Sequence, residues 1–398
     1  MTTGVERSAV ALCSLPFQIT DSREASRYPF QMNPRSSWFP LILVCALPAF
    51  AQLENADSST QEKCKQYLQT PLPAEAVAVP APKKWPDCNS YKLYSGIGTE
   101  VDYAAARKCA WSERLARQAG IEPRYSVASV FGGSAMLAVL YTNGDGLQRD
   151  SLLAGRFVCE ADGAPKEIEF RLEHLESLFK AGKPPKSKFD FCDDITSGFM
   201  EGFCAAYGSE IQDQRREHSI KSITSQFTAA QMAAFKALLK SQELYSRAHA
   251  AGEIDTSGTA RAMYQIDAEN TLREDFLEAL RTLEAGKYPQ GSAQDFQDAD
   301  ARLNTEYRKA MSDAEQHKSD YGAVQPDGIR IAERAWLKYR DAWIEFAELR
   351  YPTVEDQAWL LLLTKDRISV LDGSFCQMDD VEGSCAPQGD TWKPRPLP

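Results

Sequence analysis

The chain has 398 residues, of which 43% are hydrophobic and 25% are charged, and its formal net charge is −11. This composition is typical of a folded globular protein and excludes a chain that is mostly disordered. The length exceeds that of one ordinary domain and therefore predicts two or more domains.

Residues 32–51 have the features of a secretory signal peptide. A basic residue, Arg35, precedes an apolar run that is too brief to span a bilayer, and the small residues of the sequence AFA end this run at Ala51. We expect cleavage near Ala51, so that the mature chain is periplasmic or secreted and has no membrane span. Residues 1–31 show no periodicity and are expected to be a disordered extension upstream of the signal.

The sequence argues against two alternatives for this apolar run. A membrane anchor would be longer, and Pro40 and Pro48 would break its helix. A lipoprotein signal needs a small residue before its cysteine, whereas Val44 precedes Cys45.

Without residues 1–51 the chain carries 41 basic and 53 acidic side chains, a net charge of −12. Nucleic-acid binding requires a basic face that contacts phosphates, so this charge argues against a nucleic-acid partner. The charge is compatible with a basic protein partner.

Eight of the ten cysteines lie in the expected mature chain, and an even number in an exported protein predicts a disulfide framework. No CxxC pair occurs, which argues against a zinc ribbon or a thioredoxin-type motif. Cys376 and Cys385 are expected to close a small loop within the C-terminal residues 374–398, which end in a proline-rich tail. The pairing of the other six stays open at this point: Cys64, Cys88, Cys109, Cys159, Cys192 and Cys204.

Residues 52–85 are polar at first and then rich in proline and alanine, as in TPLPAEAVAVPAPKKWP. This composition favours an extended, polyproline-like backbone over a packed core. We therefore expect a linker that separates the folded part from whatever lies upstream.

An internal repeat occurs between residues 86 and 182. LYSGIGTEVDYAAA (93–106) and LYTNGDGLQRDSLLA (140–154) each contain a glycine turn, an aspartate four residues after its second glycine, and an alanine four residues later. This order is typical of a helix that ends in a glycine turn, followed by a capped second helix. The pattern resembles Sel-like repeats, which implies tetratricopeptide-type helical hairpins. We expect Cys88 and Cys109 to connect the first hairpin, and the two hairpins to dock on another part of the chain.

Helical signals continue beyond residue 190. Thr228 and Gln231 form a predicted capping box, and the helix that follows is expected to stop at Gly252. No segment shows the alternating pattern of a strand. The predicted fold class is all-α, with helical hairpin repeats followed by a disulfide-braced helical bundle.

An aromatic stripe lies in the sequence AERAWLKYRDAW. Its members are spaced by four, three, four and three residues, which places them on one helical face and predicts that they belong to the core. They are Ala332, Trp336, Tyr339, Trp343 and Phe346.

Arg367 interrupts the apolar face of the last predicted helix. An arginine on such a face needs a carboxylate partner, because burial of an unpaired charge is unfavourable. We expect Asp341, which follows Arg340 beside the aromatic stripe, to be that partner. We expect the pair to be a structural bridge between helices rather than a catalytic group.

Four motifs in order resemble the lysozyme inhibitor LprI-like domain of exported bacterial proteins. They are FCDDITSGFMEGFCAA, ADARLNTEYRKAM, RIAERAWLKYRDAW and LLTKDRISVL, and they span residues 190–373 with an insertion at about 210–298. The residues that match the family motif are Cys192, Cys204, Asp300, Leu303, Tyr307, Trp336, Tyr339, Arg340, Asp341 and Arg367. The resemblance implies a protein that binds and inhibits a lysozyme.

This chain departs from the family pattern at three places. Glu333 replaces the glutamine before RAW, Ile344 replaces a cysteine after RDA, and Trp359 or Leu360 replaces a second cysteine. Because this chain lacks both of these cysteines, the resemblance implies that the two pair with each other in the family. Cys192 and Cys204 would then pair locally, or with a cysteine of the repeat region.

No motif for catalysis or cofactor binding is present. The histidines (His174, His218, His249 and His317) are scattered, and none has metal-ligand spacing. We expect no metal, no cofactor and no enzymatic activity, although a wall-active hydrolase with paired acids is a third alternative. The predicted function is an exported binding protein that inhibits a basic lysozyme-type hydrolase. The alternative is a periplasmic protein-interaction scaffold that uses the Sel-like repeats.

Overall fold

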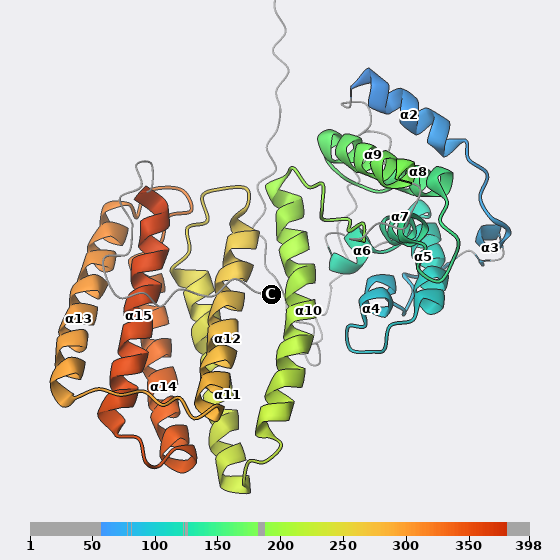
Figure 1. The fold of residues 1–398 in the computed structure, drawn as a ribbon. Coiled ribbons are helices and arrows are strands. Elements are labelled where there is room, and N and C mark those ends of the chain that lie inside the picture. Colours follow the sequence, from blue (N-terminus) through green and yellow to red (C-terminus); the bar gives the residue numbers. More distant parts are fainter. Residues whose placement is uncertain are drawn as a thin grey trace, which may run out of the picture. The chain divides into compact units, whose positions relative to one another are not determined.

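The computed structural model describes residues 57–181, apart from residues 78, 81, 122, 124 and 125, and residues 188–379. Within these residues the chain forms 14 helices and no strand, so the all-α prediction is confirmed (Figure 1). None of these helices is long and apolar enough to cross a membrane. The expected signal segment and the region upstream of it lie outside the described residues, as do Cys385 and the C-terminal tail.

The N-terminal helices surround one core. They are α2 (Ser58–Leu68), α3 (Ala74–Val77), α4 (Ser90–Ser95), α5 (Tyr103–Gln118), α6 (Val127–Phe131), α7 (Ser134–Asn143), α8 (Ser151–Glu160) and α9 (Pro165–Lys180). Trp111 of α5 and Phe157 of α8 meet edge to face at its centre. Because α7 is apolar on all sides, it is almost entirely buried between the other helices.

The 48-residue repeat of the sequence is also a repeat of backbone geometry. Gly96 after α4 and Gly144 after α7 both adopt the left-handed conformation, with φ of 72° and 77°. Asp102 and Asp150 then cap α5 and α8 through their side chains. Helices α4–α5 and α7–α8 are therefore two equivalent helix–turn–helix units, and their assignment as Sel-like repeats remains a proposal.

The linker predicted for residues 52–85 is wrong for the part that forms α2. Asp57 accepts hydrogen bonds from the first turn of this helix, and Cys64 is bonded to Cys159 of α8. Tyr67 lies against Gly155, where a Cβ atom would come within 2.4 Å of the ring. The proline-rich composition begins only at Pro71, after α2 has ended, which explains the error.

Two further disulfides connect neighbouring segments. Cys88 is bonded to Cys109 of α5, and Cys192 is bonded to Cys204. The last helix continues to Asp379, so the first residues of the predicted C-terminal loop are helical.

The boundary predicted near residue 190 does not separate two cores. Helix α10 (Gly198–Thr224) contributes Met200, Phe203 and Tyr207 to the N-terminal core. Farther along the same helix, Gln214 donates a hydrogen bond to the carbonyl oxygen of Gly96, at 2.5 Å. Helix α10 therefore belongs to both halves of the chain.

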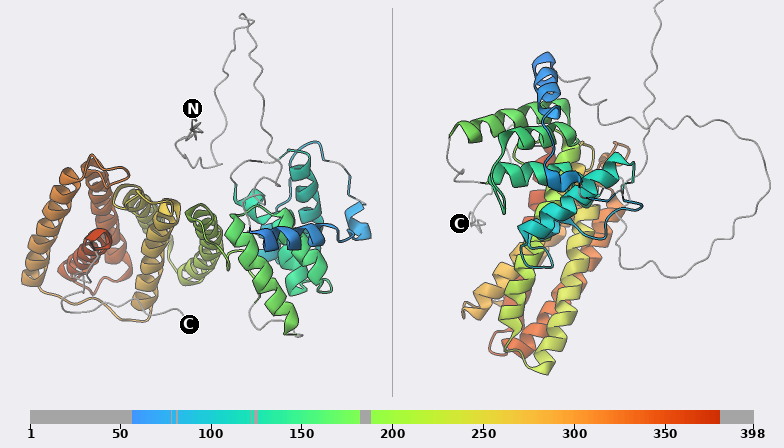
Figure 2. Two further views of the ribbon diagram at one scale, coloured as in Figure 1. Left: turned by 90° about the horizontal axis from the view of Figure 1, so that it is seen from above. Right: turned by 90° about the vertical axis from the view of Figure 1, so that its right-hand side faces the viewer.

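Six long helices form the C-terminal bundle (Figures 1 and 2). They are α10, α11 (Ala229–Gly252), α12 (Arg261–Glu284), α13 (Ala293–Gln316), α14 (Pro326–Arg350) and α15 (Asp356–Asp379). Successive helices run in opposite directions, so α10 packs parallel to α12, and α13 parallel to α15. Helix α11 packs antiparallel to α14, and their backbones touch at Gly252 and Gly328.

The aromatic stripe is part of this core, as the sequence predicts. Trp336, Trp343 and Phe346 of α14 are buried, and Tyr339 is half-buried beside them. Trp343 stacks on Trp359 of α15, with the ring centres 6.1 Å apart. Aromatic packing thus joins α14 and α15 near the positions where the LprI-like pattern has cysteines.

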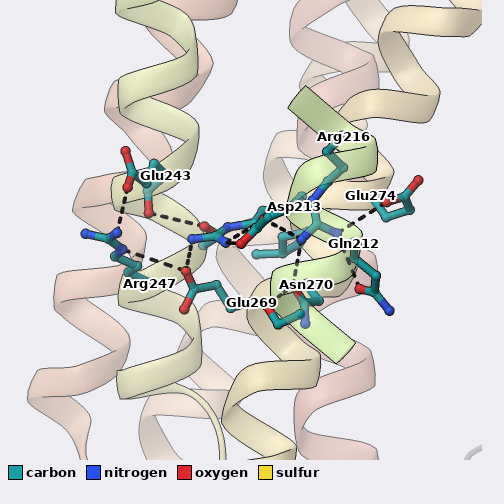
Figure 3. A network of polar contacts seen from close by, with 12 residues as sticks. Gln212, Asp213, Arg216, Glu243, Arg247, Glu269, Asn270 and Glu274 are labelled. Carbon is teal, nitrogen blue, oxygen red and sulfur yellow. Dashed lines mark hydrogen bonds and ion pairs between the residues drawn. The ribbon is translucent and has the colours of Figure 1, made fainter. Parts of the chain in front are cut away.

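Polar contacts attach α10 to the bundle (Figure 3). Arg216 of α10 donates to Asn270 at 2.9 Å and forms an ion pair with Glu274, both on α12. Glu269 of α12 in turn faces Arg247 of α11, at 3.7 Å. Since all of these residues belong to the predicted insertion, the insertion supplies helices that complete the bundle.

Candidate functional site

A buried ionic cluster lies between α11, α14 and α15, centred on Arg367. Its guanidinium group forms two hydrogen bonds with the carboxylate of Glu253, at 2.6 and 2.9 Å. It also donates to Glu333 at 2.9 Å and to the hydroxyl of Tyr245 at 3.3 Å. Arg367 and Glu253 are both completely buried, and His249 lies 2.8 Å from the second oxygen of Glu253. All the hydrogen-bonding nitrogens of Arg367 thus have acceptors.

The predicted pairing of Arg367 with Asp341 is wrong. Helices α14 and α15 are antiparallel, in a register that places Glu333 opposite Arg367. Asp341 lies eight residues farther along α14, about 12 Å away along the helix axis. It is exposed there and accepts a hydrogen bond from its neighbour Arg340.

The charges of the cluster set the protonation states of its members. Burial alone would raise the pKa of Glu253, but the charge and hydrogen bonds of Arg367 outweigh it and hold the pKa below its ordinary value. For Glu333, burial outweighs Arg367 and raises the pKa. Burial alone would lower the pKa of Arg367, but Tyr245 and the two carboxylates keep it above the usual range. Arg367 and Glu253 are therefore ionised at neutral pH.

Acidification is expected to weaken the fold through Glu253. Because its folded pKa lies below the ordinary 4.5, its contribution to stability is complete above pH 4.5 and is lost as the pH falls through the folded pKa. Urea unfolding between pH 6 and pH 3 should show a steeper loss for the wild type than for Glu253→Gln, which has no carboxyl group at this position. Parallel pH profiles would contradict this account.

The family-motif residues of α13 and α14 are mostly core residues. Leu303 and Trp336 are buried, and Tyr307 and Tyr339 pack against the same cluster. Arg340 lies over the ring of Trp336, with 5.5 Å between the guanidinium carbon and the ring centre. Asp300 lies outside this core, because it accepts a hydrogen bond from Asn304 on the surface of α13. Cys204 lies on a different helix, α10. The motif therefore builds the bundle and leaves little side-chain chemistry exposed.

Sequence reasoning missed Glu253, Tyr245 and His249. All three lie at the end of α11, in the segment predicted to be an insertion, and no spacing rule connects them to Arg367. Glu333 did carry a signal, since it introduces a carboxylate where the LprI-like pattern has glutamine. An acidic replacement in a motif that also contains a buried arginine indicates an ion pair.

A cavity of about 140 Å³ lies in the N-terminal core. Its wall is aromatic and apolar, with one ammonium group and one carboxyl group. The lining residues are Tyr94, Phe131, Met136, Val139, Lys188, Phe189, Asp190, Phe191 and Tyr207. Lys188 is held by Asp145 at 2.8 Å, and burial raises the pKa of Asp190. The volume is close to that of roughly 150 Å³ cavities that bind one small aromatic ring.

Neither the ionic cluster of Arg367 nor the cavity in the N-terminal core has the arrangement of side chains that a metal centre needs. Within residues 57–181 and 188–379, the described side chains contain no group of three or more His, Cys, Asp or Glu that could hold a metal ion. Arg367 and Glu253 are enclosed by protein and cannot reach an external substrate. The arrangement can fix the relative positions of α11, α14 and α15.

Comparison with known proteins assigns one segment of the chain. Residues 288–371 match the family described as "Lysozyme inhibitor LprI". The matched segment contains α13, α14 and most of α15, and it leaves the helices before residue 288 unassigned. Cys192 and Cys204 lie outside it. No curated protein and no solved structure matches the chain.

Proposed function

We propose that this chain is an exported binding protein that inhibits a lysozyme or a related cell-wall hydrolase. The observation that carries the proposal is the match of residues 288–371 to the LprI family. Arg367, which belongs to the motif quoted above, has its partners Glu253 and Tyr245 outside this segment. The inhibitor domain of this chain therefore includes α11 as well as the matched helices.

Two properties support export and a basic partner. The described residues contain three disulfides, which form and persist in oxidising compartments such as the periplasm or the extracellular space. The net charge of −12 for residues 52–398 attracts a basic hydrolase at long range and raises the rate of encounter. Inhibition of this kind needs only a rigid surface that blocks the access of substrate to a cleft.

A muramidase assay tests the proposal. The protein beginning at residue 52 is mixed with a basic c-type lysozyme, and lysis of a bacterial cell suspension is followed by turbidity. We expect slower lysis at low ionic strength and weaker inhibition as salt is added, because salt screens charges separated by more than about 10 Å. Unchanged lysis by several lysozymes at low ionic strength would contradict the proposal.

The cavity favours a second candidate function, a periplasmic scaffold whose Sel-like hairpins bind a protein partner. An aromatic cavity of this size suits one apolar side chain of a peptide. Val139→Phe would fill the cavity, and crosslinking in the periplasm would then show whether partner capture is lost. If Val139→Phe no longer captures a partner but still inhibits lysozyme fully, the result favours a scaffold function for this region. If the variant still captures the partner, the cavity is excluded as the binding site.

A further inference from the structure

Two aspartates, Asp275 of α12 and Asp366 of α15, lie close together beside α14. Helix α14 packs between α12 and α15 at this level, since Trp343 contacts Phe276 and Trp359, with ring centres 5.6 and 6.1 Å apart. Asp275 directly precedes Phe276 and is half-buried, whereas Asp366 is exposed. The charge of Asp275 raises the pKa of Asp366. The two carboxylates therefore form one acidic pair, the Asp275–Asp366 pair.

The Asp275–Asp366 pair has no basic partner among the described residues. Burial raises the pKa of Asp275 to about 6 and that of Asp366 to about 7. The charges that add to this effect are also acidic, namely Glu274 for Asp275 and Asp275 for Asp366. Arg367 follows Asp366 in sequence, but its guanidinium group is bonded to Glu253 in the buried ionic cluster. The chain itself thus leaves this negative charge without a counter-ion, and solvent reaches it through Asp366.

An unpaired hydrogen-bond donor lies beside the acidic pair. Trp343 is 2% exposed, and its indole N–H group has no acceptor within the part of the chain that the structure describes. This group faces the hydroxyl of Tyr339, one turn earlier on α14, without completing a hydrogen bond. The charges of both aspartates act on the same hydroxyl, so the indole and the acidic pair belong to one polar site. Buried donors without acceptors are rare, which indicates that a group from outside the chain completes the site.

Tyr339 gives this site an aromatic wall. Its half-buried ring stacks on Tyr245, with ring centres 5.5 Å apart, and contacts Phe276 at 6.4 Å. These contacts fix the ring, and burial raises the pKa of the hydroxyl, so that it stays neutral. A fixed tyrosine ring beside two carboxylates suits an ammonium or guanidinium group, through cation–π attraction and charge-assisted hydrogen bonds.

We propose that the Asp275–Asp366 pair and the ring of Tyr339 form a binding site for an organic cation with a primary ammonium or guanidinium group. The cation donates hydrogen bonds to the two carboxylates and lies against the ring. A water molecule or an oxygen atom of the ligand accepts from the indole N–H group of Trp343. Such cationic groups occur in free amines and in the lysine and arginine side chains of a basic protein. The site does not depend on the inhibitory function proposed above.

Agmatine, which carries one ammonium and one guanidinium group, is the probe for this site. The protein beginning at residue 52 is titrated in about 150 mM salt, where distant charges are screened, and the tryptophan indole N–H signals are followed by NMR. We expect one indole signal to shift, and Kd to rise by about tenfold or more in Asp275→Asn and in Asp366→Asn. Both variants should keep or raise the Tm of the wild type, since each removes a carboxylate whose folded pKa is raised.

The matched control is Asp267→Asn, which removes the same charge from the same helix. Asp267 is exposed on α12 and lies eight residues before Asp275, about 12 Å away along the helix axis. Its replacement should change Kd by less than about twofold. An equal loss of affinity in Asp267→Asn and Asp275→Asn would show that agmatine responds to the general charge of the bundle and would overturn the site.

The affinity for agmatine should rise several-fold between pH 5.5 and pH 8. The cation binds the ionised carboxylates, and Asp366, with a pKa of about 7, loses its proton over this range. The titratable groups that face Asp366 from the neighbouring helices are Asp275 and Tyr339, and neither competes as a cation. A flat pH profile would show that the carboxylates do not hold the cation.

A competition experiment with a basic c-type lysozyme separates the two sources of the cation. If agmatine displaces bound lysozyme, the natural ligand is a basic side chain of a protein partner. If agmatine binds while lysozyme stays bound, the ligand is a free amine. A wild-type protein that binds no agmatine, or variants of the acidic pair that bind it equally tightly, would overturn the site. Failure to bind lysozyme alone would contradict the inhibitory function and leave the cation site intact.

Discussion

Replacing Arg367 with methionine is expected to lower the free energy of unfolding by about 3–5 kcal/mol. Methionine has a similar length and fills much of the same space, so the effect reports mainly on the lost charge. Without Arg367, the fully buried carboxylate of Glu253 is left with His249 as its side-chain partner among the described residues, and Glu333 loses its ion pair. A buried carboxylate without a cationic partner must either take up a proton or open the packing around it.

The matched control is Arg302→Met, which breaks an arginine–carboxylate pair on the surface of the same bundle. Arg302 of α13 contacts Asp372 of α15 at 3.1 Å, and both side chains are at least 40% exposed. Its loss should change the free energy of unfolding by less than about 1 kcal/mol. Urea unfolding followed by circular dichroism compares the two variants. Equal losses of unfolding free energy would show that the buried ion pairs of Arg367 stabilise the fold no more than an exposed pair does.

The double variant Arg367→Met/Glu253→Gln separates the lost ion pair from the stranded charge. Glutamine has no charge to bury, so the double variant should be more stable than Arg367→Met alone. A double variant that loses the sum of the two single effects would mean that the two side chains do not interact. The double variant Arg367→Met/Glu333→Gln should recover less of the lost unfolding free energy, because Glu333 is partly exposed.

Much of the helical architecture could be predicted because local rules decide it. The capping box of Thr228 and Gln231 begins α11 as expected, and the spacing of the aromatic stripe gives the buried face of α14. The glycine and aspartate positions of the internal repeat correspond to equal backbone conformations in the two turns. Each of these signals lies within about fifteen residues of sequence, where geometry follows from residue type.

The pairing of distant helices could not be predicted in the same way. Arg367 required a carboxylate, but the choice among many depends on the register between α15 and its neighbours, which no local pattern records. Asp341 belongs to the recognised motif, whereas Glu253 lies 114 residues away in sequence, in what resembled an insertion. The family pattern treats this segment as an insertion, yet α11 packs along α14, and α11 with its C-cap supplies Tyr245, His249 and Glu253 to the cluster.

Removing the disulfide between Cys64 and Cys159 is expected to have the other large effect on stability. The bond connects residues 95 positions apart, and closure of so long a loop restricts the unfolded chain strongly. On the chain-entropy account, the double variant Cys64→Ala/Cys159→Ala should lose about 4.7 kcal/mol. Helix α2 should also lose its protection from hydrogen exchange, since Thr60 and Cys64 are its only buried residues.

The bond between Cys192 and Cys204 provides the control, because it connects residues only 12 positions apart. The same account gives about 2.8 kcal/mol for its removal, so the two double variants should differ by roughly 2 kcal/mol. Guanidinium unfolding of both variants measures the difference, and mass spectrometry confirms that the remaining bonds are intact. An equal loss of unfolding free energy in the two double variants would show that the attachment of α2 adds little to the stability of the rest of the N-terminal core. In that case the N-terminal core would be held by the contacts of α7 and α8, and α2 would be an appendage that the disulfide keeps in place.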